Sequence, residues 1–185
     1  GGGRPSHPAV RFRFESGALL VFDDTRRFGS VQAFSDEDWL IRSARIGPEP
    51  LGPQYRAKDL FDGLQRSRAP ARSWLLDQKR IAGVGNIYAS EALFGARIRP
   101  TTPSGRISRP RMQRLVAEIK AVLQRAIDCG GTTINDYLGS GDGGRFQQEL
   151  AVYGRAGEGC IVCDKPITNK VLSGRSTFYC TTCQH

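Results

Sequence analysis

The 185-residue sequence predicts an α+β fold, with a β part first, a helical part in the middle and a metal-binding β-hairpin last. Apolar and basic residues alternate over residues 10–14, which is the period of a half-buried strand. Between Met112 and Ile127 apolar residues recur at helical spacing, which predicts one long amphipathic helix. Near the end, two C-x-x-C pairs supply four thiols at the spacing of a zinc site.

The β part is expected to begin with a hairpin. Residues 10–14 and 18–22 form its strands around a turn at Ser16 and Gly17, and residues 30–34 read as a further strand. Ser35 and three acidic residues after it indicate a helix start, because acidic groups stabilise the first turn. A Pro- and Gly-rich stretch at 46–53 marks the boundary with the helical part.

The loop before the third expected strand carries Arg26, Arg27 and Phe28. Guanidinium groups bind phosphates, and an aromatic ring can wedge between bases. The same stretch is equally consistent with Phe28 in the core and solvated arginines. The sequence of this loop alone does not decide between the two interpretations.

The central stretch, residues 74–100, predicts two short helices joined by Gly83-Val84-Gly85, as in a helix-turn-helix element. Asn86 lies where the second helix starts. Its amide either caps that helix or points outward beside free backbone N–H groups, where a phosphate can bind.

After the long helix, Cys129 is expected to be a buried, inert thiol. Residues 132–138 are expected to add a short helical piece. The Gly-rich stretch at 139–144 is expected to be either a plain linker or a lid over a ligand.

Lys and Arg number 27 against 18 Asp and Glu, giving a formal net charge of +9. This excess favours a polyanionic partner, with nucleic acid the first candidate and a merely soluble basic protein the alternative. No apolar run approaches the length of a membrane span, and no signal segment is recognised. We therefore expect a cytosolic protein without a membrane partner.

The four paired cysteines, Cys160, Cys163, Cys180 and Cys183, predict a closed site for one structural zinc ion. Such a site has no open coordination position, so the metal supports folding and not catalysis. Residues 170–179 between the pairs read as a β-hairpin with Arg175 near its tip. A redox motif or two disulfides are the alternatives, and both fit poorly with a basic, cytosolic chain.

Several short motifs recur in a fixed order from about His7 onward. They are residues 24–29 (DTRRFG), 47–51 (GPEPL), 77–79 (DQK), 83–91 (GVGNIYASE), 130–133 (GGTT), 152–155 (VYGR) and the cysteine hairpin ending in Gln184. Together they resemble the formamidopyrimidine-DNA glycosylase (Fpg/Nei) family of bacterial base-excision repair enzymes. The resemblance implies a helix–two-turns–helix DNA-binding element followed by a zinc hairpin.

The resemblance also implies a division into three parts. Residues 1–46 would hold the last strands of a β-sandwich domain, as a remnant of it. Residues 47–150 would form the helix–two-turns–helix domain, and residues 151–185 the four-cysteine zinc finger. The implied partner is double-stranded DNA with an oxidised base or an abasic site, bound by a monomer in the bacterial cytosol or nucleoid.

Several residues acquire roles through the resemblance. Three neighbours in the β part would fill the gap left by a flipped-out base, and two later residues would clamp the phosphates beside it. Arg175 would also donate a proton in the second elimination step, and residues 139–146 would close over 8-oxoguanine. The implied DNA-binding positions are His7, Arg26, Arg27, Phe28, Arg66, Arg68, Lys79, Asn86 and Arg175.

The implied activity is that of a bifunctional glycosylase and abasic-site lyase removing 8-oxoguanine and formamidopyrimidine. In the family the chemistry starts from an N-terminal proline followed by glutamate, whereas Pro5 has neither a free amine nor a glutamate after it. We expect this chain to contribute damaged-DNA binding to such an enzyme. The alternatives are a catalytically inactive, naturally truncated nucleic-acid-binding zinc protein and, more distantly, a zinc-ribbon protein of the translation machinery.

Overall fold

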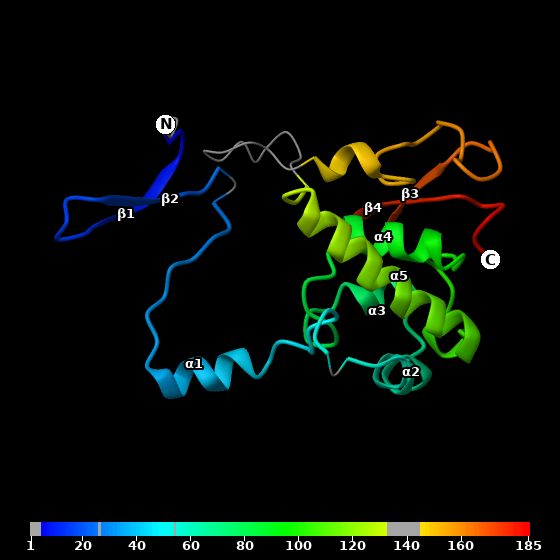
Figure 1. Ribbon diagram of the computed structural model, residues 1–185, viewed down its shortest axis with the longest axis horizontal. Coiled ribbons are helices and arrows are strands. Elements are labelled where there is room, and N and C mark those ends of the chain that lie inside the picture. The colour runs from blue at the N-terminus through cyan, green and yellow to red at the C-terminus, as the bar shows by residue number, and fades with distance from the viewer. Residues whose placement is uncertain (1–4, 26, 54, 133–144) are drawn as a thin grey trace.

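The computed structural model describes residues 5–25, 27–53, 55–132 and 145–185 and has the expected α+β class (Figure 1). Its two sheets are antiparallel pairs, β1 with β2 and β3 with β4. In chain order the elements are β1 (Pro8–Arg13), β2 (Leu19–Asp23), α1 (Asp36–Ser43), α2 (Ala57–Gln65), α3 (Ala71–Leu75), α4 (Asn86–Gly95), η1 (Ser104–Arg106), α5 (Arg109–Asp128), η2 (Phe146–Glu149), β3 (Thr168–Leu172) and β4 (Arg175–Tyr179).

Helix α5 confirms the long amphipathic helix predicted from its apolar spacing. It tolerates Pro110 because a proline in the first turn removes an N–H that has no partner within the helix. The helix ends before Gly130, whose φ of +73° is the left-handed conformation that glycine adopts without strain. Its buried stripe consists of Met112, Leu115, Val116, Ile119, Val122, Leu123 and Ala126.

Helix α4 is the central element of the core, since residues 89–94 are buried around its whole circumference. Helix α5 packs on it, with α2 and α3 nearby. From α2, Leu60 and Leu64 enter the same cluster, and Trp74 and Leu75 enter it from α3. These helices form one apolar body, which the elements at the C-terminal end then meet.

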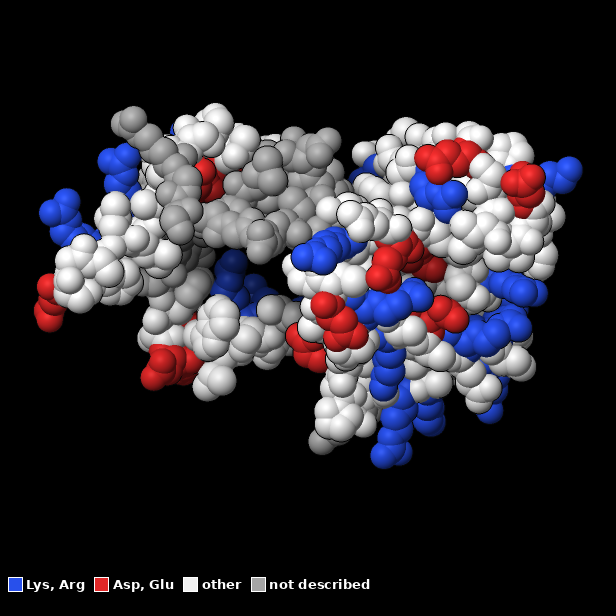
Figure 2. Space-filling model, turned by 45° about the horizontal axis from the view of Figure 1, so that its top comes forward, with Lys and Arg blue, Asp and Glu red and all other residues white. Residues whose placement is uncertain are grey.

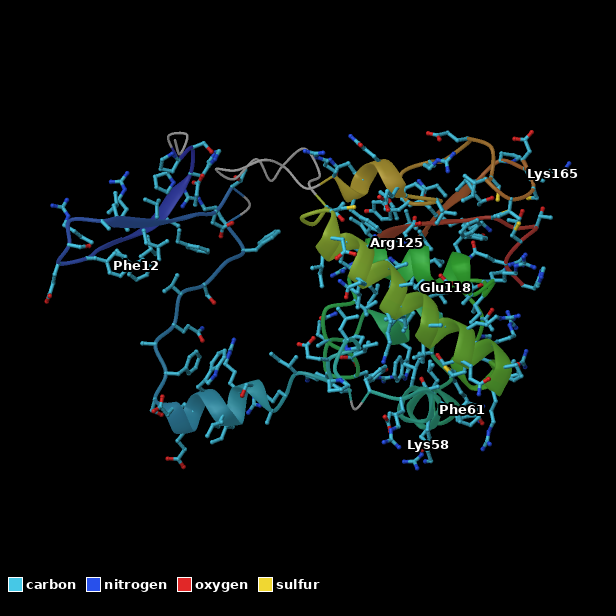
Figure 3. All side chains as sticks on the ribbon, viewed as in Figure 1. Phe12, Lys58, Phe61, Glu118, Arg125 and Lys165 are labelled. Carbon is cyan, nitrogen blue, oxygen red and sulfur yellow. The ribbon has the colours of Figure 1, made fainter. Side chains whose placement is uncertain are left out.

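The N-terminal elements have a different character. Figure 1 shows the β1–β2 hairpin and α1 set apart from the helical body, and no residue of α1 is buried. Phe12, which lies on the hairpin (Figure 3), is 38% exposed, and Leu40 on α1 is 68% exposed. Ser35 caps α1 by accepting the Asp38 N–H at 3.1 Å, so this helix is held by local contacts more than by core packing.

One expected strand is wrong. Residues 30–34 belong to no strand or helix. The alternating pattern was present, but a strand also requires a neighbouring strand to accept its hydrogen bonds. In the described part of the chain, β1 and β2 pair with each other and neither pairs with residues 30–34.

The Pro- and Gly-rich stretch is bound to the helical body through its backbone. Gly47 donates to the Gln78 carbonyl at 2.8 Å, and the Ala82 N–H donates to Pro48 at 3.1 Å. A Cβ on Gly47 would lie 2.6 Å from the backbone of Arg80 and Ile81. Only glycine therefore permits this close approach.

This contrast in burial predicts unequal responses to the same truncation. Leu93→Ala should lower the free energy of unfolding by about 2–5 kcal/mol, because a fully buried leucine leaves a cavity. The matched change Leu40→Ala on exposed α1 should alter it by less than about 0.5 kcal/mol. Urea unfolding followed by circular dichroism measures both, and equal losses would contradict the placement of the core.

Candidate nucleic-acid interface and metal centre

Asn86 is the first residue of α4, and its side chain is engaged on both sides. The Oδ1 atom accepts from Arg72 Nη2 at 2.6 Å and from Arg72 Nε at 3.2 Å. On the other side, Nδ2 donates to the Ser176 carbonyl of β4 at 3.0 Å. Gly85 is the N-cap and has no side chain to cap the helix, so the interpretation of Asn86 as a plain N-cap is wrong.

The turn before α4 is held by Gln78, a residue whose role the sequence did not reveal. Its Nε2 donates to the Val84 carbonyl and its Oε1 accepts from the Gly83 N–H, both at 2.9 Å. Gly83 has a φ of +74°, which explains the need for glycine there. Lys79 lies exposed on the same turn.

Two buried polar side chains attach the C-terminal segment to the helical body. Glu91 of α4 accepts the backbone N–H groups of Ala151, Val152 and Tyr153 at 2.8–3.0 Å. Gln184 donates to the Ile98 carbonyl at 2.8 Å and accepts the Cys180 N–H at 2.9 Å. Buried bonds of this kind are costly to break, because each leaves unpaired polar groups out of contact with water.

The four cysteines predicted to bind metal converge at the base of the β3–β4 hairpin. Their Sγ atoms all lie within 4.8 Å of one another. Cys163 and Cys180 are 3.5 Å apart, and Cys160 and Cys183 are 3.9 Å apart, too far for sulfur–sulfur bonds. Zinc–sulfur bonds of about 2.3 Å place the corners of a tetrahedron about 3.8 Å apart, so the sulfurs fit a zinc ion.

Backbone groups support the same cluster. The Val162 N–H points to Cys160 Sγ at 3.5 Å, and the Cys183 N–H points to Cys180 Sγ at 3.4 Å. Hydrogen bonds from N–H groups stabilise negative charge on thiolates. The redox and disulfide alternatives explain neither this convergence nor its geometry.

Arg175 lies at the hairpin tip, as predicted, and is exposed. It pairs with Leu172 across the turn, and the Leu172 carbonyl accepts from Arg72 Nη1 at 3.1 Å. The hairpin tip is therefore joined to the start of α4 through both Arg72 and Ser176. These bonds bring Asn86 and Arg175, predicted from separate parts of the sequence, to the same region.

The remaining predicted positions in the β part lie apart from this region (Figure 1). His7 is exposed, and its backbone N–H donates to Asp23 Oδ1 at 2.6 Å. Phe28 is 82% exposed, so the interpretation of this ring as core is wrong. Asp24 shapes the loop by accepting the Gly29 N–H at 2.7 Å, and Arg27 has a φ of 56°.

Some expectations fall on residues outside the described ranges. Arg26 is one of them, as are residues 133–144, which include most of the expected helical piece and of the loop at 139–146. At the end of that loop Phe146 is described and is buried, with its ring 5.9 Å from Tyr88.

Three arginines shortly before the central stretch, Arg66, Arg68 and Arg72, differ in their exposure. Arg66 and Arg68 are exposed, whereas Arg72 is fully buried. A sequence signal for this difference exists, because Arg72 lies four residues before Leu76 and next to Ala71 on an apolar helix.

The basic side chains do not form one continuous patch on the face of the molecule that Figure 2 shows. The Lys and Arg side chains there are spread over several places, with acidic groups between them.

Cys129 is only half-buried at the end of α5, where a buried thiol was expected. Its Sγ donates to Glu149 Oε1 at 3.4 Å. Burial and this carboxylate raise the pKa of the thiol, which agrees with an unreactive cysteine.

In the described ranges, no helix has the length and apolar character that crossing a bilayer requires.

Comparison with known proteins places these features in a family. Residues 46–137 match the formamidopyrimidine-DNA glycosylase H2TH domain, and residues 157–185 match the zinc finger found in FPG and IleRS. Formamidopyrimidine-DNA glycosylases of Teredinibacter turnerae and Yersinia pseudotuberculosis are each 45% identical to the chain. The alignments cover 97% of the chain and 66% and 67%, respectively, of the relatives.

Solved structures agree with this result. The MutM (Fpg) protein of Thermus thermophilus superposes with a TM-score of 0.88 at 39% identity, over 99% of this chain and 72% of that one. Lactococcus lactis Fpg in complex with abasic-site DNA gives a TM-score of 0.90 at 33% identity, over 98% of this chain and 68% of that one.

The fold and the cysteine cluster define a helix–two-turns–helix protein with a zinc hairpin. More specifically, the chain belongs to the formamidopyrimidine-DNA glycosylase family. It spans about two thirds of the length of the curated relatives it matches. The four cysteines hold one structural Zn²⁺, as the sequence predicted.

The metal centre predicts different outcomes for two cysteine substitutions. Cys180→Ser should abolish stoichiometric zinc binding and unfold the β3–β4 hairpin, because thiolate ligation joins two turns with a small core of their own. Cys129→Ser, outside the cluster, should retain one zinc per chain. Elemental analysis and circular dichroism test this, and a zinc-free parent or a fully folded Cys180→Ser variant would contradict it.

Proposed function

We propose that this chain binds damaged duplex DNA as part of a bifunctional DNA glycosylase and abasic-site lyase acting on oxidised purines in base-excision repair. The relatives are named formamidopyrimidine-DNA glycosylases, and the Lactococcus lactis structures contain Fapy-dG or abasic-site DNA. Both findings support the proposal.

The observation that carries the proposal is the joint placement of Asn86 and Arg175. One contributes an amide at the N-terminus of α4, where the first backbone N–H groups of a helix favour anions. The other contributes an exposed guanidinium on the adjoining hairpin, suited to bidentate phosphate contact. We propose that together they clamp the phosphates beside a flipped nucleotide.

The exposed loop of the β part fits a second role. Phe28 presents an apolar ring to solvent, and Arg27 precedes it. We propose that these residues and Arg26 fill the space that a flipped base vacates, because an apolar wedge offsets part of the cost of unstacking. His7, Arg66, Arg68 and Lys79 would add contacts to the backbone, since all four are exposed.

In the reaction itself, the proposed role of Arg175 is to donate a proton in the second elimination step. The zinc ion supplies no step, because its four thiolates close the coordination shell. Its proposed contribution is to keep the hairpin folded so that Arg175 stays beside Asn86.

We propose the same three-part organisation as the sequence indicated, with divisions near residues 46 and 150. The two apolar clusters support it, since one lies in the helical body and the other surrounds the cysteines. We also propose a monomer acting in the bacterial cytosol or nucleoid, where the DNA substrate lies.

Removal of either clamp residue should weaken DNA binding. Asn86→Ala and Arg175→Ala should each cost about 1–3 kcal/mol of binding free energy, the range for hydrogen bonds to a charged group. The parent's affinity should also fall steeply with salt, because phosphate contacts release counterions. Fluorescence anisotropy with a duplex containing a tetrahydrofuran abasic analogue measures the affinity of each variant and the salt dependence of the parent.

Arg125→Ala provides the control for loss of one positive charge away from the clamp, since Arg125 is exposed on α5 (Figure 3). Its effect should be smaller than that of Arg175→Ala. Clamp variants that bind like the parent, or a flat salt response, would contradict the proposed clamp.

The 185-residue polypeptide itself should bind abasic duplex without excising 8-oxoguanine at a useful rate. Glycosylase chemistry of this kind needs a positioned amine, and Pro5 lies within the chain, so its nitrogen is in a peptide bond. Borohydride trapping on 8-oxoguanine duplex should capture little covalent complex. Efficient trapping or many turnovers of base release would contradict this, whereas failure to bind any DNA would contradict the proposed function.

A further inference from the structure

Arg72 is the one fully buried basic side chain in the described part of the chain, with 0% of its surface exposed. Arginine is rarely buried to this extent without a charged partner. It lies in the short helix α3, one turn before the apolar residue Leu76, and its guanidinium reaches towards α4 and the β3–β4 hairpin.

The hydrogen-bond acceptors of Arg72 are all neutral. They are Asn86 Oδ1, at 2.6 and 3.2 Å, and the Leu172 carbonyl, at 3.1 Å. Among the described residues, the ion pairs found involve Lys58, Arg80 and Arg155, so no carboxylate pairs with Arg72.

Burial and the nearby charge of Arg175 both lower the pKa of Arg72, which shows the physical cost of a cation at this place. A well-packed apolar side chain would avoid that cost. The position therefore suits a function of the guanidinium better than it suits stability alone.

The chemistry of the two side chains fixes the orientation of the Asn86 amide. Arginine carries N–H donors and no acceptor, so the atom of Asn86 that faces it must be the oxygen. The amide nitrogen then faces the Ser176 carbonyl with one N–H and keeps a second N–H for another acceptor. If the amide rotated by 180°, it would turn its oxygen outward, which would repel a phosphate.

Arg72 also acts on the hairpin tip. Its Nη1 bond to the Leu172 carbonyl holds the strand residue that pairs with Arg175. One side chain thus sets the outward donor of Asn86 and the place of the turn that carries Arg175.

We propose that Arg72 is the positioning residue of the clamp: it orients Asn86 and the hairpin tip for a phosphate, and the bound phosphate supplies the negative charge that the site otherwise lacks. This inference rests on the proposed function, because the anion it invokes is a DNA phosphate. Arg72 itself need not touch the DNA.

A double-mutant cycle tests this mechanism. Arg72→Met keeps an unbranched, flexible side chain and removes all of its hydrogen-bond donors. It should weaken binding to the tetrahydrofuran duplex about tenfold or more, as should Asn86→Ala. Because part of the effect of Arg72 runs through Asn86, the combined loss in the double variant should be clearly smaller than the product of the two single losses, and the remaining part should come from the hairpin tip.

Two further variants sharpen the result. Arg72→Lys keeps the charge but loses the planar fork, so it should bind between the parent and Arg72→Met. Arg125→Met removes one exposed charge elsewhere and should have the smallest effect. If the losses of Arg72→Met and Asn86→Ala multiply in the double variant, or if Arg72→Met binds like the parent, the inference is wrong.

A measurement without DNA separates this inference from the proposed function. In the free parent, NMR should show slow exchange with solvent for the Asn86 side-chain amide proton that faces the Ser176 carbonyl, and Arg72→Met should abolish that protection. Unchanged amide signals would overturn the inference. A parent that binds no DNA but shows the predicted amide signals would overturn the proposed function alone. If Arg72→Met fails to fold, Arg72→Lys replaces it in both measurements.

Discussion

The hydrogen bonds between helix α4 and the C-terminal hairpin are the constraint on which the rest of the site depends. Asn86 at the start of the helix bonds to Ser176, and Glu91, just over one turn later, bonds to three successive N–H groups at residues 151–153. Because both groups lie on one rigid helix, residues 151–153 and strand β4 are fixed relative to each other. The hairpin is thereby oriented relative to the helical body as well as attached to it.

The zinc cluster contributes at a different level. Four thiolates fold the hairpin locally, and its small apolar cluster includes Phe94 of α4, Val152 and Phe178. The metal determines the shape of the hairpin, and the polar contacts of α4 determine its place. A loss of zinc would therefore also release the Leu172 and Ser176 carbonyls from Arg72 and Asn86.

The sequence predicts the local features of this protein well. The stripe of α5, the start of α1 and the cysteine hairpin each follow from residues close together in the chain. The wrong strand at 30–34 shows the limit of such patterns, because its period was correct and its partner was missing. Phe28 shows another, since an aromatic ring in a loop does not reveal whether it is buried.

The polar contacts between distant segments were beyond sequence reasoning. Arg72 and Leu172 are 100 residues apart, and Asn86 and Ser176 are 90 apart. The spacing of Arg72 from the apolar residues of α3 suggests burial, but no periodicity predicts which distant groups its guanidinium meets. Gln78 and Glu91 are similar cases, because their roles depend on backbone groups that only the folded chain brings near.

The central claim is that Asn86 and the hairpin tip bind particular phosphates beside the damaged nucleotide. Replacement of single phosphates by uncharged methylphosphonates in an abasic duplex tests it most directly. For the parent, affinity should fall sharply at one or two positions flanking the abasic site, and Asn86→Ala should be insensitive at the position that its amide contacts. An even loss along the duplex, or the same profile for parent and variant, would contradict the clamp.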